Sequence, residues 1–263
     1  MSDQKQMWQL VKFELASPSL KHFLNQLLVL VVTAFIFEAF IYLIHQNSNE
    51  HFSDIVFDVF LLLVVLFYPQ VLRQPAFRIT DLKGGLYATP FYVYATQLPI
   101  KQHVLMRSRF ILSFVYCVSV TVMAIAFAYV FPKIINALFD VEALGFFLGT
   151  LHDLFTPAEF GAFITIWGLF AAAFSGLFAA ADVGGTYTKK ALFGYNILYL
   201  LVLLVVLAGL NFLTGRGLVD WTIVLATNAP FSGIVGFALF ALVCHVIWHW
   251  EARRYARKVD YHV

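Results

Sequence analysis

Six long apolar runs alternate with polar segments along the chain. The runs lie at residues 23–44, 54–72, 110–131, 158–181, 191–213 and 228–248. A helix needs about 20 predominantly apolar residues to cross the hydrocarbon core of a bilayer. The pattern therefore predicts an all-α integral membrane protein with six transmembrane helices.

The basic residues indicate how these helices are oriented. Fifteen of the seventeen Lys and Arg residues lie before the first run, in every second gap, or after the last run. The opposite gaps contain only Lys133 and Arg216. Because basic residues mark the cytoplasmic side, we expect both termini in the cytoplasm of a multi-pass plasma-membrane protein. Segment 73–107 is then cytoplasmic, and segment 132–157 is an outer loop.

Composition agrees with this class of protein. Hydrophobic residues make up 61% of the chain and charged residues 12%, which is typical of a protein that faces lipid. The net charge of +2 reflects orientation and does not indicate nucleic-acid binding. Cys117 and Cys244 both lie inside predicted spans, with neither a disulfide framework nor the spacing of metal ligands.

The chain divides into a cytoplasmic N-terminal segment, 1–21, and a transmembrane domain, 22–263. In the first segment, Trp8, Val11 and Leu15 recur at helical spacing, with polar side chains on the other face. We expect residues 3–16 to form an amphipathic helix that lies in the headgroup region of the membrane.

Two carboxylates fall within or near the apolar runs. Glu38 lies in the first span and Asp58 early in the second. An unpaired carboxylate at membrane depth is costly, so both should face protein or water. They either make a protonated or hydrogen-bonded contact between helices or line a translocation path, and we retain them as candidate path residues.

Small residues recur every four positions in the fourth span, at Gly168, Ala172, Gly176 and Ala180. Such a ridge allows a neighbouring helix to approach closely. We expect it to support helix packing, within the subunit or across a dimer.

Motifs for chemistry are missing from the sequence. Gly184 and Gly185 are not followed by the glycine-lysine junction of a P-loop, and Val246 stands where a zinc protease has its glutamate, between His245 and His249. These observations predict a chain that is not an enzyme and carries no metal or cofactor of its own.

One segment carries a family resemblance. The run Asp-Leu-Lys-Gly-Gly at 81–85 precedes Leu98-Pro99-Ile100-Lys101, and residues 104–110 then lead into the third span. This order resembles ABC transporter permeases of the type-2 exporter class, as does the layout of an N-terminal amphipathic helix and six spans. Only Asp81 stands before the glycines, where that family often has an acidic run.

The resemblance implies a transmembrane permease that pairs with a second permease copy, identical or related, and with cytoplasmic P-loop ATPase subunits. ATP and Mg are then bound by those partners, and a helix within 84–97 fits a groove of the ATPase. The cargo is hydrophobic or amphiphilic: a peptide, a lipid or a drug-like molecule. The candidate coupling residues are Gly84, Gly85, Leu86, Tyr87, Leu98, Pro99 and Lys101.

Two other classes of function remain open. An intramembrane enzyme could use Glu38 or the pair His245 and His249. A non-catalytic accessory or immunity subunit could have the same number of helices as a permease.

Overall fold

The structure is a computed structural model of the chain. The residues that it describes are 2–16, 24–25, 28, 58, 62, 73, 77, 79–81, 86–96, 99–139, 155–183, 187–188, 190, 194, 197, 201, 205, 208–209, 211–212 and 215–258.

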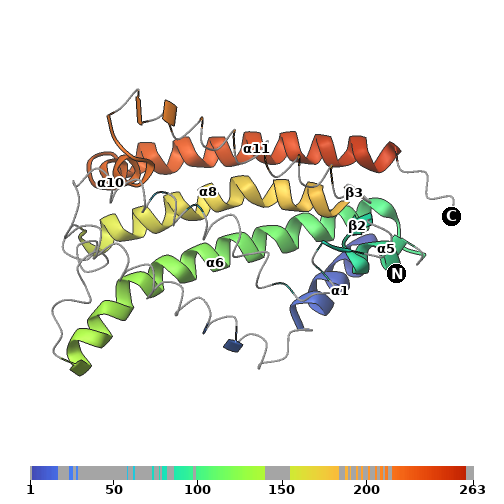
Figure 1. Cartoon of the computed structure of the whole chain (residues 1–263), viewed down its shortest axis with the longest axis horizontal. Helices are drawn as coiled ribbons and strands as arrows, with labels where there is room; N and C mark the ends of the chain where they lie inside the picture. The colour runs from blue at the N-terminus through green and yellow to red at the C-terminus, as the bar shows by residue number, and fades with distance from the viewer. Residues whose placement is uncertain are drawn as a thin grey trace.

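Three long helices dominate the described part of the chain: α6 (Gln102–Phe139), α8 (Pro157–Val183) and α11 (Pro230–Lys258). Helix α8 lies between the other two and packs along both (Figure 1). Each of the three contains a stretch long and apolar enough to cross a membrane. They correspond to the third, fourth and sixth apolar runs, whereas the first, second and fifth runs lie largely outside the described residues.

The starts of these helices have local causes. Thr156 and Glu159 form a reciprocal capping box at α8, with the Thr156 amide donating to Glu159 Oε2 at 2.7 Å and the Glu159 amide to Thr156 Oγ1 at 3.4 Å. Pro157 and Pro230 occupy the first positions of α8 and α11, where a missing amide proton costs nothing.

Helix α6 is longer than the sequence predicted. Its 38 residues give a length of about 57 Å at 1.5 Å per residue. Residues 104–110 lead into the third span as helix, as the sequence predicted, and the helix continues to Phe139, so the predicted outer loop 132–157 starts as helix. A further helix, α10 (Leu218–Asn228), precedes α11 and was not predicted as a separate element.

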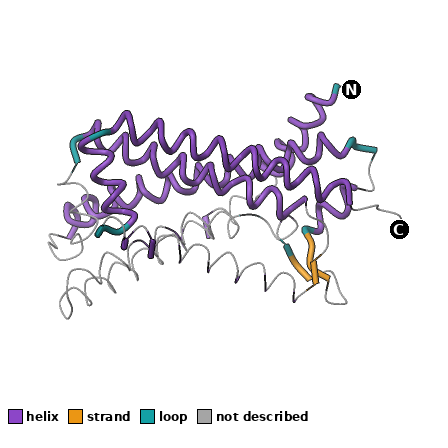
Figure 2. The backbone as a smooth tube through the Cα atoms, turned by 90° about the horizontal axis from the view of Figure 1, so that it is seen from above, coloured by secondary structure: helices purple, strands orange, loops and turns teal. Residues whose placement is uncertain are grey.

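The remaining described elements lie at one end of the long helices, where α6 begins and where α8 and α11 end (Figures 1 and 2). They are helix α1 (Asp3–Ala16), helix α5 (Pro90–Thr96) and three short strands. We call this the α1 end.

The strands were not predicted. They form a three-stranded antiparallel sheet in the order β1-β2-β3. The strands are β1 (Thr80–Asp81), β2 (Leu86–Ala88) and β3 (Tyr187–Thr188). Thr80 pairs with Ala88, and Leu86 pairs with Thr188. The sheet therefore joins two segments that the sequence analysis predicts to lie on the same side of a membrane.

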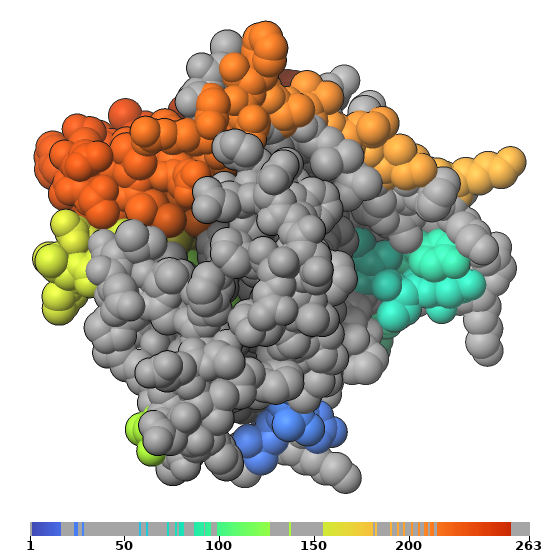
Figure 3. All heavy atoms as spheres, turned by 60° about the vertical axis from the view of Figure 1, so that its left-hand side comes forward, coloured from blue at the N-terminus to red at the C-terminus, as the bar shows by residue number. Residues whose placement is uncertain are grey.

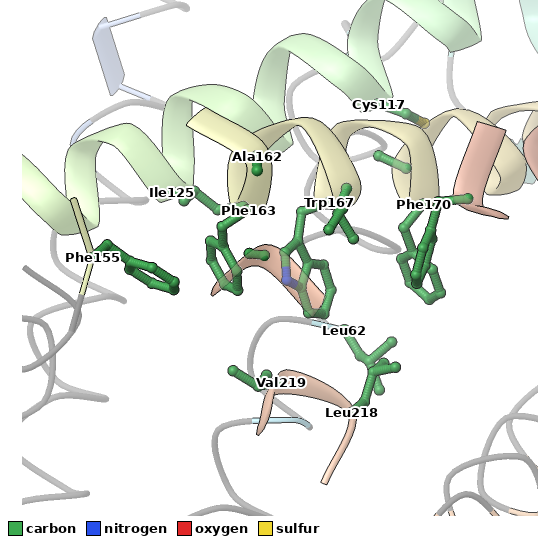
Figure 4. Close-up of a cluster of buried hydrophobic side chains, with 14 residues drawn as sticks. Leu62, Cys117, Ile125, Phe155, Ala162, Phe163, Trp167, Phe170, Leu218 and Val219 are labelled. Atoms are coloured by element: carbon green, nitrogen blue, oxygen red, sulfur yellow. The ribbon is translucent and has the colours of Figure 1, made fainter. Parts of the chain in front are cut away.

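The main apolar core surrounds α8. Phe163, Trp167 and Phe170 project from one side of this helix towards Leu62 and Leu218 (Figure 4). The indole Nε1 of Trp167 donates to Thr222 Oγ1 at 3.1 Å, which satisfies its buried donor and ties α8 to α10.

Candidate functional site: a buried ion cluster at the α1 end

Two arginines and two carboxylates are buried together at the α1 end. They are Glu14 of α1, Arg73, Arg109 of α6 and Asp182 of α8, and each side chain is at most 3% exposed. The four formal charges sum to zero. Because an unpaired charge in an apolar interior is very costly, this balance is what allows all four groups to be buried.

Arg73 bridges the two acids. Its Nε and Nη2 each donate to Glu14 Oε1 at 3.3 Å, and its Nη1 lies 2.7 Å from Asp182 Oδ2. Arg73 follows the second apolar run directly in the sequence. It thereby links that segment to α1 on one side and to α8 on the other.

Arg109 contacts the second oxygen of Glu14. Its Nη1 pairs with Glu14 Oε2, so each carboxylate oxygen of Glu14 meets a different guanidinium. The Arg109 guanidinium carbon also lies 5.7 Å from the ring centroid of Phe77 and 5.2 Å from that of Phe91. Attraction of the cation to both ring faces supplements the single ion pair.

Helix α5 is attached to the cluster at two points. Thr89, immediately before α5, donates from Oγ1 to Asp182 Oδ1 at 3.2 Å. Phe91, in the first turn of α5, stacks on Phe13 of α1 with ring centroids 6.0 Å apart, and lies 4.8 Å from Phe77. The short helix is therefore held to α8 by a hydrogen bond and to α1 and α6 by its aromatic side chain.

A second, exposed set of ion pairs joins the start of α1 to the start of α6. Lys101 Nζ lies 2.9 Å from Asp3 Oδ1, and His103 Nε2 lies 2.9 Å from Asp3 Oδ2. Hydrogen bonds from Lys101, and then from His103, lower the pKa of the Asp3 carboxyl group. Helix α1 is thus attached near both of its ends.

These attachments revise the faces that we assigned to α1. The helix has the predicted bounds, Asp3–Ala16, but Val11 is buried together with Glu14, while Trp8 and Leu15 are exposed. The sequence grouped Val11 with Trp8 and Leu15. The protein-facing side is instead set by Val11 and by the ion pairs of Asp3 and Glu14.

The candidate coupling residues lie before and after α5 along the chain. Leu86 and Tyr87 belong to β2, and Pro99 and Lys101 precede the start of α6 at Gln102. The Lys101 carbonyl accepts from the amides of Val104 and Leu105, so the hydrogen bonds of α6 begin at Lys101. Gly84, Gly85 and Leu98 lie outside the described residues. Helix α5 itself falls within the 84–97 segment, with Tyr94 60% exposed.

Asp58 caps a helix. Its Oδ2 and Oδ1 accept from the amides of Leu218 and Val219, each at 2.7 Å, at the first turn of α10. Gly217, the N-cap residue, has no side chain for this role, and a Cβ there would lie 2.7 Å from Asp58 Oδ2. Capping accounts for a buried carboxylate at position 58 without a translocation path. Glu38 lies outside the described residues.

The small residues of α8 contact both neighbouring helices. At Gly176 a Cβ would lie 2.8 Å from Trp248 Cδ1 of α11, so only glycine fits there without a shift. Gly168 faces Val118 and Val122 of α6 at ordinary contact distance. Ala172 packs in a cluster with Ala241, and Ala180 in one with Phe110, Leu105 and Ala252.

An open apolar groove of about 420 Å³ lies between the three long helices. Phe110 and Phe114 of α6, Leu169 of α8 and Leu242 of α11 line it, with His245 as its polar side chain. The His245 and His249 rings both contact Phe110 edge-on, at 5.2 Å between centroids. Within the described residues, no group of three or more His, Cys, Asp or Glu side chains could hold a metal ion.

Sequence reasoning missed the ion cluster, although a signal for it was present. Arg109 directly precedes the third apolar run, and Asp182 directly follows the fourth. Charged residues at such positions commonly pair with one another, but their partners, Glu14 and Arg73, cannot be identified from spacing along the chain.

Comparisons of the chain with protein-family models, with curated proteins and with solved structures found no match.

Proposed function

We propose that the chain is the transmembrane permease subunit of an ATP-driven ABC exporter, with six spans and both termini in the cytoplasm. It pairs with a second permease copy, and cytoplasmic P-loop ATPase subunits bind and hydrolyse ATP with Mg. The cargo is hydrophobic or amphiphilic, and an apolar groove such as the one lined by Phe110 and Leu242 suits such a molecule.

The arrangement of the described elements supports this orientation. Helix α6 leads away from the α1 end, and α8 and α11 return to it (Figure 1), as third, fourth and sixth spans do. Pairing of β2 with β3 brings together the two gaps that carry the basic residues between spans. The α1 end is accordingly the cytoplasmic end in our proposal.

The attachment of α5 is the observation that carries the proposal. A short helix stands at this end, with Tyr94 outward and Phe91 inward, and connects through Thr89 to α8 and through Arg109 to α6. A force applied to α5 by a partner is therefore delivered to two long helices at once. Closure of the ATPases shifts the population of the permease between conformations in this scheme.

Affinity purification of the tagged chain in mild detergent tests the proposal. We expect a P-loop ATPase to co-purify in stoichiometric amount and to hydrolyse ATP. Tyr94→Glu should abolish this association, because it places a charge on the outward face of α5. Ala16→Glu, which adds a charge at another exposed position, on α1, serves as the control and should retain it. Purification of the wild-type chain without an ATPase, or with an ATPase that Tyr94→Glu also retains, would refute the proposal.

A second variant separates binding of the partner from transmission of its motion. Thr89→Val removes the hydrogen bond to Asp182 and leaves Tyr94 in place. We expect the ATPase to bind normally while transport per ATP hydrolysed falls. Unchanged transport would show that the link from α5 to α8 carries no part of the coupling.

A further inference from the structure

Helix α1 separates its acidic and basic residues onto two sides. Asp3 and Glu14 both pair towards α6, whereas Lys5 and Lys12 are exposed. Within the described residues, neither lysine amine takes part in an ion pair. Because the acids are committed on the inner side, the outer side has an unbalanced positive charge.

Apolar surface accompanies this charge. Trp8 lies one turn from Lys5 and one turn from Lys12 and is 46% exposed, and Leu15 is 41% exposed. Lys5 and Lys12 are separated by about 10 Å along the axis, given 1.5 Å per residue. The space-filling view brings the opposite end of the long helices forward, where α10 and the start of α11 form the upper left of the surface (Figure 3).

The same side is hollowed. An open depression of about 540 Å³ is lined by Ser2, Gln4, Lys5, Trp8, Gln9 and Lys12. Its lining provides two ammonium groups, two amide side chains and a hydroxyl, with an indole between the cations. This combination matches a phosphate ester attached to an apolar body, since the ammonium and amide groups donate to the phosphate and the indole packs against the glycerol and first methylenes.

The geometry points to a binding site for the headgroup of an anionic phospholipid on the outer side of α1, formed by Lys5, Trp8, Gln9 and Lys12. Charge complementarity decides for an anionic lipid over a zwitterionic one. The attachment of α1 at Asp3 and Glu14 holds this side of the helix in a fixed position relative to α6. The site exists whether or not the chain is a transporter subunit, so it goes beyond the proposed function.

Native mass spectrometry of the full chain in detergent tests the site, with phosphatidylglycerol and phosphatidylcholine of the same acyl chains as probes. We expect the first phosphatidylglycerol to bind more tightly than phosphatidylcholine. A lysine near an anionic surface contributes about 1 kcal/mol, so the double variant Lys5→Gln, Lys12→Gln should bind phosphatidylglycerol about 25-fold more weakly, which corresponds to about 2 kcal/mol. Its affinity for phosphatidylcholine should not change.

The matched control is Lys190→Gln, Arg253→Gln, which removes two exposed charges elsewhere at the α1 end and should leave phosphatidylglycerol binding intact. Far-UV circular dichroism confirms folding of both double variants. Three results overturn the inference: equal affinity of the wild-type chain for both lipids, an equal loss in the control, or displacement of the lipid by glycerol phosphate or poly-glutamate at matched charge. The last would assign the site to a free anion or an acidic polypeptide.

Discussion

Substituting Glu14 with glutamine tests the ion cluster at the carboxylate that pairs with both arginines. Glutamine keeps the shape of the side chain and one acceptor oxygen, but it removes the charge shared by two arginines. Arg73 retains Asp182 at 2.7 Å, whereas Arg109 retains only the rings of Phe77 and Phe91. Removing one partner of a buried ion pair typically costs about 3–5 kcal/mol. Because Arg73 stays paired, we expect the low end, about 3 kcal/mol of unfolding free energy.

A double-mutant cycle isolates the charge effect from changes in packing. Arg109→Gln alone leaves the cluster with one excess negative charge, and Glu14→Gln alone leaves one excess positive charge. The double variant is neutral again and keeps the pair of Arg73 with Asp182. Contacting residues in one network show interaction energies of about 0.5–3 kcal/mol. We therefore expect the double variant to lose about 2 kcal/mol less than the sum of the two single losses.

The assay is titration of the purified chain with dodecyl sulfate in mixed micelles, followed by far-UV circular dichroism. Glu251→Gln, which removes a half-buried acid on α11, is the control and should stay within about 0.5 kcal/mol of the wild type. Two results would contradict a buried ion pair between Glu14 and Arg109. One is a loss of unfolding free energy in Glu14→Gln as small as that in Glu251→Gln, and the other is a loss in the double variant equal to the sum of the two single losses.

Three further predictions concern separate contacts. Asp3→Asn should destabilise the chain at neutral pH. The two basic partners of Asp3 lower the pKa of its carboxyl group. The difference in stability between variant and wild type should therefore persist as the pH falls to about 3.8, the ordinary pKa of this group, and disappear at lower pH, where the two melting curves should converge. Asp58→Ala removes the cap of α10 and should cost about 2 kcal/mol in the dodecyl sulfate titration, whereas a loss below 0.5 kcal/mol would deny the capping role. Gly176→Ala forces a shift of Trp248 and should cost about 1–3 kcal/mol, while Gly161→Ala, with open space around its Cβ, should cost nothing; equal thermal stability of the two would contradict the contact.

The sequence predicted the helices well where their signals were local. Helix α1 occupies the predicted range, and α8 begins within one residue of its apolar run at a Thr-Pro-Ala-Glu capping sequence. The sheet could not be predicted in this way. Its strands have two or three residues each, too few for an alternating pattern to mark them, and β2 pairs with β3 across about a hundred residues of chain, as Leu86 does with Thr188.

The candidate site was less predictable for a related reason. Individual charges near the ends of apolar runs are visible in the sequence, but their partners are set by tertiary packing. Glu14 illustrates this: only the packing of α1 on α6 brings it to Arg73 and Arg109. Helical periodicity also grouped Val11 with Trp8 and Leu15, whereas Val11 is buried and the other two are exposed, because ion pairs help to decide which side of α1 faces the protein.

The location of the cluster bears on how the proposed exporter moves. Ion pairs and the Thr89 hydrogen bond join α1, α5, α6 and α8 at one end. Helix α11 packs on α8 through apolar contacts that include the close approach of Trp248 to Gly176. Apolar contacts are not directional, so they tolerate sliding better than hydrogen-bonded charges with fixed partners. In the proposed exporter, we therefore expect a force on α5 to move α6 and α8 together and to be relieved at the interface between α8 and α11. The apolar groove, which α6, α8 and α11 line together, is the space whose shape such a displacement changes.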